Sequence, residues 1–432
     1  MSGPRQSQTE VSHSTAVRRK PMLRLRPRPN RRLPAELHAE PVYQQACQWP
    51  EHEREQRLAV LLSRLDQSHW RHGDPLQLYT AGRCAYAAML ANIAAAESEI
   101  LLESYIIRND QTGQRIARAL GLAARRGISV KILADAWGSS RLRPPFWEAL
   151  ADAGSEFRLF RRPRSAPRIL LPILDHRKLL IVDRQIAYTG GMNIADEYHY
   201  GRDGMPPWRD THIRVQGSLA VDMARLFFES WELAGGDGVL IPSSTSKAQA
   251  GPRSLLLDTL PGRGQQEMHA AIAGLLGAAR QRVWISNAYF APQPWLLKML
   301  ADCAQRGVDV RLLLPGPTDV PWVRYAGQAA YTQLLREGVR IYEYQPAVLH
   351  CKTMLADRNW GLVGSTNWDA RSFRWNHECN VLVWDHAINA ELAQHFEQDL
   401  HHSLEINLRT WRRRPLAQRL RNALFALFRA WL

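Results

Sequence analysis

One pattern of six residues, His-x-Lys-x4-Asp-x6-Gly-[Gly/Ser]-x-Asn, occurs twice in this chain and constrains its fold more than any other feature. The first copy contains His176, Lys178, Asp183, Gly190, Gly191 and Asn193, and the second contains His350, Lys352, Asp357, Gly364, Ser365 and Asn367. Six residue types at one spacing rarely recur by chance, so we expect an internal duplication. A chain of 432 residues is long enough for two units with substantial cores.

The similarity between the halves extends beyond the two motifs. Each half contains an apolar strand candidate, a helical pattern that ends at a glycine, and a second strand candidate. These segments are 98–107, 119–126 and 128–133 in the first half, and 282–290, 296–306 and 308–313 in the second. Strand, helix and strand in series predict a right-handed crossover. We therefore expect an α/β fold of two similar halves, each a mostly parallel sheet flanked by helices, with the active site at their interface.

Composition predicts the order of segments along the chain. Residues 1–45 are rich in arginine and proline, which predicts a disordered basic segment. A polar Pro/Ser/Gly stretch predicts a linker at 241–255, between a first domain at 46–240 and a second at 256–405. Residues 406–432 predict a basic amphipathic helix whose apolar face contains Leu416, Leu420, Leu424, Leu427 and Trp431.

Each motif places a histidine and a lysine two residues apart in an apolar run that predicts a buried strand. Side chains at this spacing share a face, so we expect His176 beside Lys178 and His350 beside Lys352. Such a pair suits phosphoryl transfer. Imidazole can attack phosphorus or donate a proton, and ammonium can hold the nonbridging oxygens.

The remaining motif residues are expected to bind phosphate or to shape the strand ends. Asn193, Asn367 and Ser365 lie next to glycines that let the backbone approach a ligand closely, so they are the expected phosphate contacts. Asp183 and Asp357 have the opposite strand parity. We interpret these two aspartates mainly as structural residues.

The doubled His-Lys-Asp pattern resembles that of the phospholipase D superfamily, whose members build one active site from both copies and count both aspartates in the catalytic set. Within that superfamily the chain is most similar to bacterial cardiolipin synthases of the shorter type, which lack N-terminal transmembrane helices. The resemblance covers about residues 75–400, and segments 101–105, 188–193, 287–290 and 364–373 carry it.

A nucleophilic histidine also needs a carboxylate at its other ring nitrogen, because that hydrogen bond fixes the tautomer. Glu378 resembles the acidic residue that the family places downstream of its motif for this purpose. Asp210 is its counterpart in the first half, at a slightly longer spacing.

The resemblance implies a cardiolipin synthase that moves a phosphatidyl group from phosphatidylglycerol to phosphatidylglycerol or phosphatidylethanolamine through a phosphatidyl-histidine. We take His176 as the nucleophile and His350 as the acid and base, although the sequence treats them almost symmetrically. No metal or other cofactor is expected, and a bell-shaped pH profile is expected from the two histidines. The alternatives are a phospholipase D that forms phosphatidic acid and, ranked below it, a nuclease of the superfamily.

The charge balance predicts an anionic partner, because the formal net charge is +15. The apolar stripe at the C-terminus, and the arginines mixed with aliphatic residues at 161–174, favour an anionic phospholipid membrane over nucleic acid. No apolar run reaches the roughly 20 residues that span a bilayer. We therefore expect a peripheral protein on the cytoplasmic face of the cell membrane, with its five scattered cysteines reduced.

Overall fold

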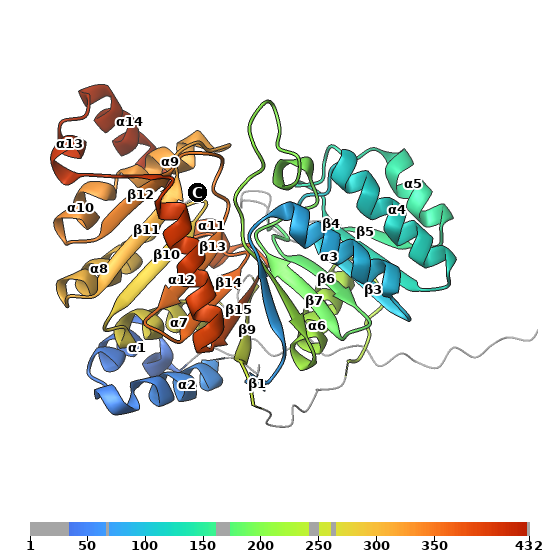
Figure 1. Ribbon diagram of the computed structural model, residues 1–432, viewed down its shortest axis with the longest axis horizontal. Helices are drawn as coiled ribbons and strands as arrows, with labels where there is room; N and C mark the ends of the chain where they lie inside the picture. The colour runs from blue at the N-terminus through green and yellow to red at the C-terminus, as the bar shows by residue number, and fades with distance from the viewer. Residues whose placement is uncertain (1–33, 66–68, 161–172, 242–249, 261–264, 430–432) are drawn as a thin grey trace, which may run out of the picture.

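Two β-sheets pack face to face, and helices cover their outer faces (Figure 1). The computed structural model describes residues 34–65, 69–160, 173–241, 250–260 and 265–429. The expectations for 1–33, for 161–172, for most of the linker and for Trp431 lie outside these residues.

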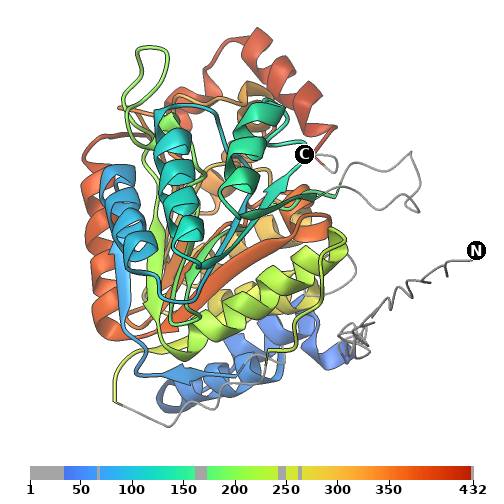
Figure 2. The same cartoon turned by 90° about the vertical axis from the view of Figure 1, so that its right-hand side faces the viewer.

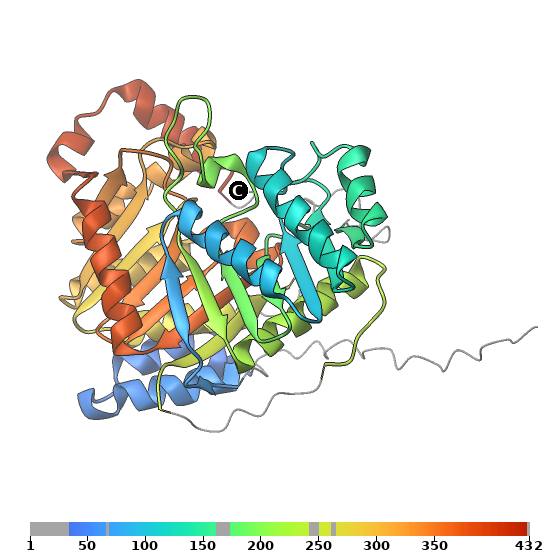
Figure 3. The same ribbon diagram turned by 45° about the vertical axis from the view of Figure 1, so that its right-hand side comes forward.

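The first sheet has seven strands. In spatial order they are β2 (Leu76–Tyr79), β8 (His212–Gln216), β7 (Ile186–Gly190), β6 (Lys178–Val182), β3 (Glu99–Ser104), β4 (Ser129–Asp135) and β5 (Glu156–Phe160). Helices α3 (Gly82–Ala95), α4 (Gln111–Arg125) and α5 (Pro144–Asp152) bury their apolar residues against its outer face (Figure 3). Helix α4 begins at Asp110, whose carboxylate accepts from the backbone N–H of Gly113 at 2.9 Å.

The second sheet has nine strands. In spatial order they are β1 (Arg71–His72), β9 (Arg253–Thr259), β15 (Glu378–Trp384), β14 (Trp360–Gly364), β13 (Lys352–Ala356), β10 (Arg282–Asn287), β11 (Asp309–Pro315), β12 (Arg340–Tyr344) and β16 (Ser403–Glu405). Its outer face packs against α7 (Gln265–Ala278), α8 (Pro294–Gln305) and α10 (Tyr331–Arg336). Helices α9 (Pro321–Gln328) and α11 (Ala370–Arg374) lie at the end of the sheet where the second motif begins.

The inner faces of the two sheets share one apolar core. Leu179 and Ile181 of β6, from the first motif, belong to the same buried cluster as Leu355 of β13, from the second. Helices α6 (Ser218–Leu233) and α12 (His386–Leu400) contribute Phe227 and Phe396 to this cluster. The two halves therefore bury their motif strands against each other.

The predicted α/β class is confirmed, but the sheets are mixed rather than mostly parallel. Among the named strands of the described residues, parallel pairing joins β3–β4–β5 and β10–β11–β12. The predicted strand-helix-strand segments correspond to β3, α4 and β4 and to β10, α8 and β11, and they did not include β5 or β12. The motif strands form the hairpins β6–β7 and β13–β14, and strands joined by a short turn must pair antiparallel. Asp183 and Arg184, with φ values of 52° and 55°, form the turn of the first hairpin.

The N-terminal boundary differs from the expectation of disorder through residue 45. Two short 3-10 helices, η1 (Ala35–Leu37) and η2 (Glu51–Glu53), precede α1 (Ala39–Cys47) and α2 (Arg54–Leu65) respectively, and all four lie against the second half (Figure 1). Val42, Tyr43 and Ala46 are buried there, because their helical spacing places them on one face of α1. Residues 34–65, and β1 with its pairing to β9, therefore belong structurally to the second domain.

The C-terminal segment forms two helices instead of the one expected. Helix α13 (Leu408–Arg412) ends before Pro415, which is the N-cap of α14 (Leu416–Ala426). Of the predicted apolar face, Leu416, Leu420 and Leu424 are exposed on α14 and Leu427 is exposed at its C-cap, while Asn422 is buried against α9. Within the described ranges, no helix combines the length and apolar character that crossing a bilayer requires.

Candidate active site

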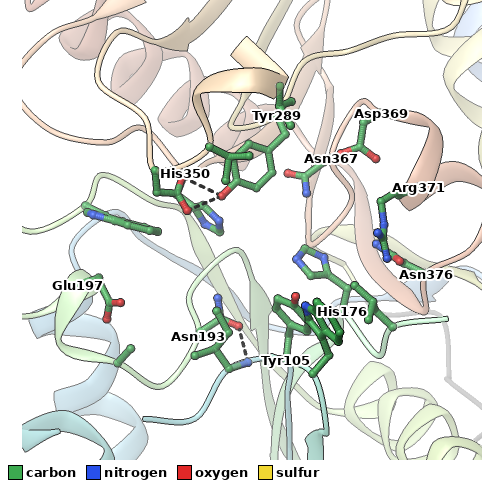
Figure 4. A pocket seen from close by; sticks show the side chains of 18 of the residues that line it. Tyr105, His176, Asn193, Glu197, Tyr289, His350, Asn367, Asp369, Arg371 and Asn376 are labelled. Atoms are coloured by element: carbon green, nitrogen blue, oxygen red, sulfur yellow. Dashed lines mark hydrogen bonds between the residues drawn. The ribbon is translucent and has the colours of Figure 1, made fainter. Parts of the chain in front are cut away.

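The two motifs meet at one cavity of about 430 Å³ between the sheets. His176 precedes β6 and His350 precedes β13, and both side chains line this cavity together with Asn193 and Asn367 (Figure 4). Both histidines are buried, with 6% and 3% of their surface exposed. The sequence expectation that the motifs come together thus matches their placement.

His176 of the first half pairs with Glu378 of the second. Its Nδ1 lies 3.0 and 3.1 Å from the two carboxylate oxygens of Glu378, at the start of β15. The backbone fixes this pairing, because the N–H of His176 donates to the carbonyl of His377 at 3.0 Å. The opposite ring nitrogen of His176 is left for chemistry in the cavity.

His350 pairs with Asp210 across the same interface in the opposite direction. Its Nδ1 lies 2.8 Å from Oδ2 of Asp210, a residue just before β8 of the first half. Here too the backbone is joined, since the N–H of His350 donates to the carbonyl of Arg209 at 2.7 Å. Each half therefore supplies the carboxylate for the histidine of the other half, which the spacing within a single motif does not reveal.

The two motifs differ at one position of the pattern, which is glycine in the first motif and serine in the second. The two carboxylates explain this difference. The hydroxyl of Ser365 donates a hydrogen bond to the carboxylate of Glu378 and holds it in place. Ser365 does not belong to the cavity lining, which differs from its expected contact with phosphate. Gly191 occupies the equivalent place in the first motif, where a Cβ would lie 2.1 Å from Oδ1 of Asp210. A glycine is required there because the carboxylate fills the space of a side chain.

Each motif lysine lies beside the histidine of its own motif. The ammonium of Lys178 donates to the carbonyl of His176 at 2.6 Å, and that of Lys352 donates to the carbonyl of His350. Both ammonium groups are nearly inaccessible to solvent, and neither belongs to the cavity lining. The charges of both lysines act on His176, and the charge of Lys352 also acts on His350.

Burial dominates the protonation of these groups. It lowers the pKa of His176 well below its ordinary value and, with the charge of Lys352, lowers the pKa of His350 to about 4. It also lowers the pKa of Lys178 to about 7 and raises the pKa of Glu378 to about 7. A bound phosphodiester would add negative charge beside the imidazoles and favour their charged forms.

The other predicted residues separate into two groups. Asn193 faces the cavity and is held by its own contacts, because its amide donates to the hydroxyl of Tyr198 at 2.8 Å and accepts from the N–H of Ile106 at 3.1 Å. Asp183 and Asp357 lie at the far ends of the motif strands, outside the cavity lining. The carboxylates of these aspartates accept from backbone N–H groups at 97–99 and 280–282 respectively.

Sequence reasoning missed the aromatic residues around the histidines. Tyr105 contacts the ring of His176 edge-on with centroids 5.0 Å apart, and Tyr289 contacts that of His350 at 5.8 Å. The two tyrosines hold equivalent places after β3 and β10, so the internal repeat was the available signal. In the described segments, no cluster of three or more His, Cys, Asp or Glu side chains is arranged to hold a metal ion.

Sequence comparisons with known proteins identify one family. Residues 89–203 and 272–400 match the family model described as cardiolipin synthase, PLD-like domain. The chain is 31% identical over 373 residues to the cardiolipin synthase of Clostridium perfringens (strain SM101 / Type A), covering 84% of this chain and 78% of that relative. It is 32% identical over 389 residues to cardiolipin synthase 2 of Bacillus anthracis, covering 87% and 74%.

The fold also matches a solved structure. The phosphatidylserine synthase of Haemophilus influenzae Rd KW20 superposes with a TM-score of 0.70, covering 87% of this chain and 99% of that one. The sequence identity of 14% limits this likeness to the fold.

Proposed function

The chain belongs to the cardiolipin synthase family of the phospholipase D superfamily, an enzyme family of phosphatidyltransferases, and from this membership we propose that it transfers a phosphatidyl group from phosphatidylglycerol to a second phospholipid. The observation that carries the proposal is the pair of histidines on one cavity, each oriented by a carboxylate of the opposite half. Two such histidines provide a nucleophile and an acid for one phosphodiester.

The first half of the cycle forms a covalent intermediate. Nε2 of His176 attacks phosphorus, a P–N bond forms, and the P–O bond to the headgroup glycerol breaks. His350 donates its proton to the departing glycerol oxygen. Lys178 and Lys352 neutralise the nonbridging oxygens, and the amides of Asn193 and Asn367 add hydrogen bonds.

The second half of the cycle reverses these roles. The neutral imidazole of His350 takes the proton of the acceptor hydroxyl, the acceptor oxygen bonds to phosphorus, and the P–N bond to His176 breaks. Cardiolipin leaves when the acceptor is phosphatidylglycerol. Water attacking the same intermediate would give phosphatidic acid, so exclusion of water from the cavity decides between transferase and hydrolase.

The test is product analysis with purified protein on vesicles of phosphatidylglycerol, with and without phosphatidylethanolamine. We expect cardiolipin from wild type and none from His176→Ala or His350→Ala. His52→Ala is a matched control, because that side chain is 79% exposed and far from the motifs in sequence. Phosphatidic acid alone would identify a hydrolase, and no lipid product would refute the proposal.

We further propose that the protein attaches peripherally to an anionic membrane by the end of the molecule that bears α14. Nine of the fourteen large apolar side chains that are most exposed in the described ranges lie on segments that border the cavity or on the C-terminal segment that packs against α9. They are Trp137, Tyr200, Met205, Trp322, Leu416, Leu420, Leu424, Leu427 and Phe428. Helix α14 and the 199–207 loop lie at the same end of the molecule in two perpendicular views (Figures 1 and 2).

The contacts of α14 explain why its apolar side faces outward. Arg421 lies over the ring of Tyr325 with its guanidinium carbon 3.7 Å from the centroid, and Asn422 donates to Gln328, so the polar side of α14 is bound to α9. Trp322 of the same α9 lines the cavity. A lipid surface against α14 would thus lie next to the cavity mouth, where substrate enters.

Vesicle sedimentation tests this attachment. The double variant Leu420→Glu/Leu424→Glu is expected to lose binding to phosphatidylglycerol vesicles. Leu122→Glu on α4, where Leu122 is 52% exposed compared with 55% for Leu424, is expected to bind like wild type. Vesicle binding by the double variant equal to that of Leu122→Glu would refute the role of α14.

A further inference from the structure

An exposed carboxylate lies at the mouth of a cavity that otherwise suits an anionic lipid. Asp319 lines the cavity from the loop between β11 and α9. The hydroxyl of Tyr289 lies 2.9 Å from each of its carboxylate oxygens. Within the described ranges Asp319 has no partner besides Tyr289, so most of its capacity to accept hydrogen bonds is unused.

The other two carboxylates of the cavity lining already have partners. Glu197 forms ion pairs with Arg108 at 2.7 Å and with Arg202 at 2.8 Å. Asp369 caps α11 by accepting from the N–H of Ser372 at 2.8 Å, and burial raises its pKa to about 7. Within the described part of the chain, Asp319 is therefore the carboxylate of this lining that neither forms an ion pair nor caps a helix, although its charge also acts on His350 and Lys352.

The position of Asp319 separates two sides of the cavity. Its partner Tyr289 packs edge-on against His350, with an interplanar angle of 84°. Arg371 lies on the opposite side, beyond His176 (Figure 4). A carboxylate repels a lipid phosphate and attracts groups that donate hydrogen bonds, so the His350 side suits the alcohol part of a headgroup.

We propose that Asp319, held by Tyr289, forms a headgroup subsite that binds hydrogen-bond donors of the lipid headgroup. The inference rests on the proposed phosphatidyl transfer and deepens it. The donors are the free hydroxyls of a polyol headgroup or the ammonium of an ethanolamine headgroup. Asp319 touches the headgroup, and Tyr289 is a positioning residue that fixes the carboxylate.

The subsite also gives the two histidines different tasks. The leaving alcohol and the incoming hydroxyl both pass the same side of phosphorus, opposite the nucleophile. A headgroup held by Asp319 places that oxygen beside His350, which then donates and accepts its proton. His176 remains on the opposite side as the nucleophile.

The test compares donor lipids that differ only in headgroup. Phosphatidylglycerol, phosphatidylethanolamine and phosphatidylmethanol with identical acyl chains are presented in detergent micelles, and kcat/KM for release of each alcohol is measured. The variants are Asp319→Asn, Tyr289→Phe and, as a control that also removes one negative charge, Asp152→Asn at the exposed end of α5. Thermal unfolding checks that every variant is folded.

We expect the ratio of kcat/KM for phosphatidylglycerol to that for phosphatidylmethanol to fall about tenfold in Asp319→Asn, as loss of a charge-assisted hydrogen bond implies. Tyr289→Phe should lower the same ratio by about threefold, and Asp152→Asn should not change it. A fall that is larger for phosphatidylethanolamine would identify the ammonium as the preferred donor group and equally support the subsite.

An unchanged ratio in Asp319→Asn, with all donors slowed equally or not at all, would overturn the inference while wild-type activity on phosphatidylglycerol upholds the proposed function. Release of no headgroup by wild type from any donor would instead refute the proposed function, and the subsite with it.

Discussion

The smallest change expected to disable the site is Gly191→Ala. Its Cβ would lie 2.1 Å from Oδ1 and 2.5 Å from Oδ2 of Asp210, a side chain with no exposed surface. Carbon and oxygen atoms in contact need more than about 3 Å, so the carboxylate must retreat by roughly 1 Å. The backbone of Gly191 does not contribute strain, because its φ lies outside the left-handed region.

The consequence of that displacement can be worked out from the pairing with His350. The bond from Nδ1 to Oδ2 is 2.8 Å long, and a further 1 Å removes it as a hydrogen bond. Loss of a histidine-orienting carboxylate typically lowers kcat by about 10²- to 10⁴-fold. Overpacking of a buried site costs about 1–3 kcal/mol of stability, so the protein should remain folded.

The assay measures cardiolipin formation and thermal unfolding for Gly191→Ala, Asp210→Ala and the double variant. Gly121→Ala in α4 is the control, because its Cβ would meet Ala153 at an ordinary 3.4 Å. If the alanine at position 191 lowers the rate by displacing the carboxylate of Asp210, the double variant should be no slower than Asp210→Ala alone. Activity of Gly191→Ala within threefold of wild type, or fully additive losses in the double variant, would refute the reasoning.

Three further predictions concern protons, stability and metals. The rate of cardiolipin formation should peak near pH 7. Protonation of Glu378 below its pKa of about 7 removes the acceptor for His176, and deprotonation of Lys178 above its pKa of about 7 removes a phosphate contact. A flat profile of kcat/KM from about pH 5 to 9 would contradict this prediction. Asp183→Ala should lower the free energy of unfolding by roughly 2–4 kcal/mol through lost hydrogen bonds and the left-handed turn. Partial burial alone would raise the pKa of Asp183, but its hydrogen bonds with Glu99, Glu97 and Ser98 lower it overall. The part of this stability that depends on the ionised carboxylate is therefore present above the unfolded pKa of about 3.9 and lost as pH falls through the folded pKa. There the difference between denaturant melts of variant and wild type should narrow to the contribution of the left-handed turn. Cardiolipin formation should survive EDTA, because protein cations hold the phosphoryl oxygens; a strict need for added divalent metal would count against the mechanism.

Local patterns in the sequence were sufficient to predict the two motif strands. Period-two spacing placed His176 with Lys178, and the opposite parity of Asp183 predicted its position at the far strand end, where it bonds the backbone. The bell-shaped pH profile was assigned to the two histidines. That assignment stays a prediction, but burial lowers the pKa of both histidines, so we expect the limbs to follow Glu378 and Lys178 instead.

The pairing of each histidine with the carboxylate of the other half depends on how the halves pack, and spacing within one half carries no information on that packing. Composition also failed where tertiary contacts decide. The average composition of residues 1–45 is rich in arginine and proline, and it gave no sign of the buried face of α1. The single helix expected over 406–432 is interrupted at Pro415. The parallel sheets expected from the crossovers omitted the motif hairpins, whose short turns were not recognised.

The attachment of α1, α2 and β1 to the second half has a consequence for synthesis. These elements leave the ribosome before the first sheet does, but their partners, β9 and α7, lie about 200 residues later and follow after roughly 10–40 s at ordinary translation speeds. Until then the apolar faces of α1 and α2 have nothing to pack against, while the first sheet can already fold. Assembly should therefore end with α1, α2 and β1 packing against β9 and α7, which are made much later, and that late step is the one at which a chaperone would have most to protect.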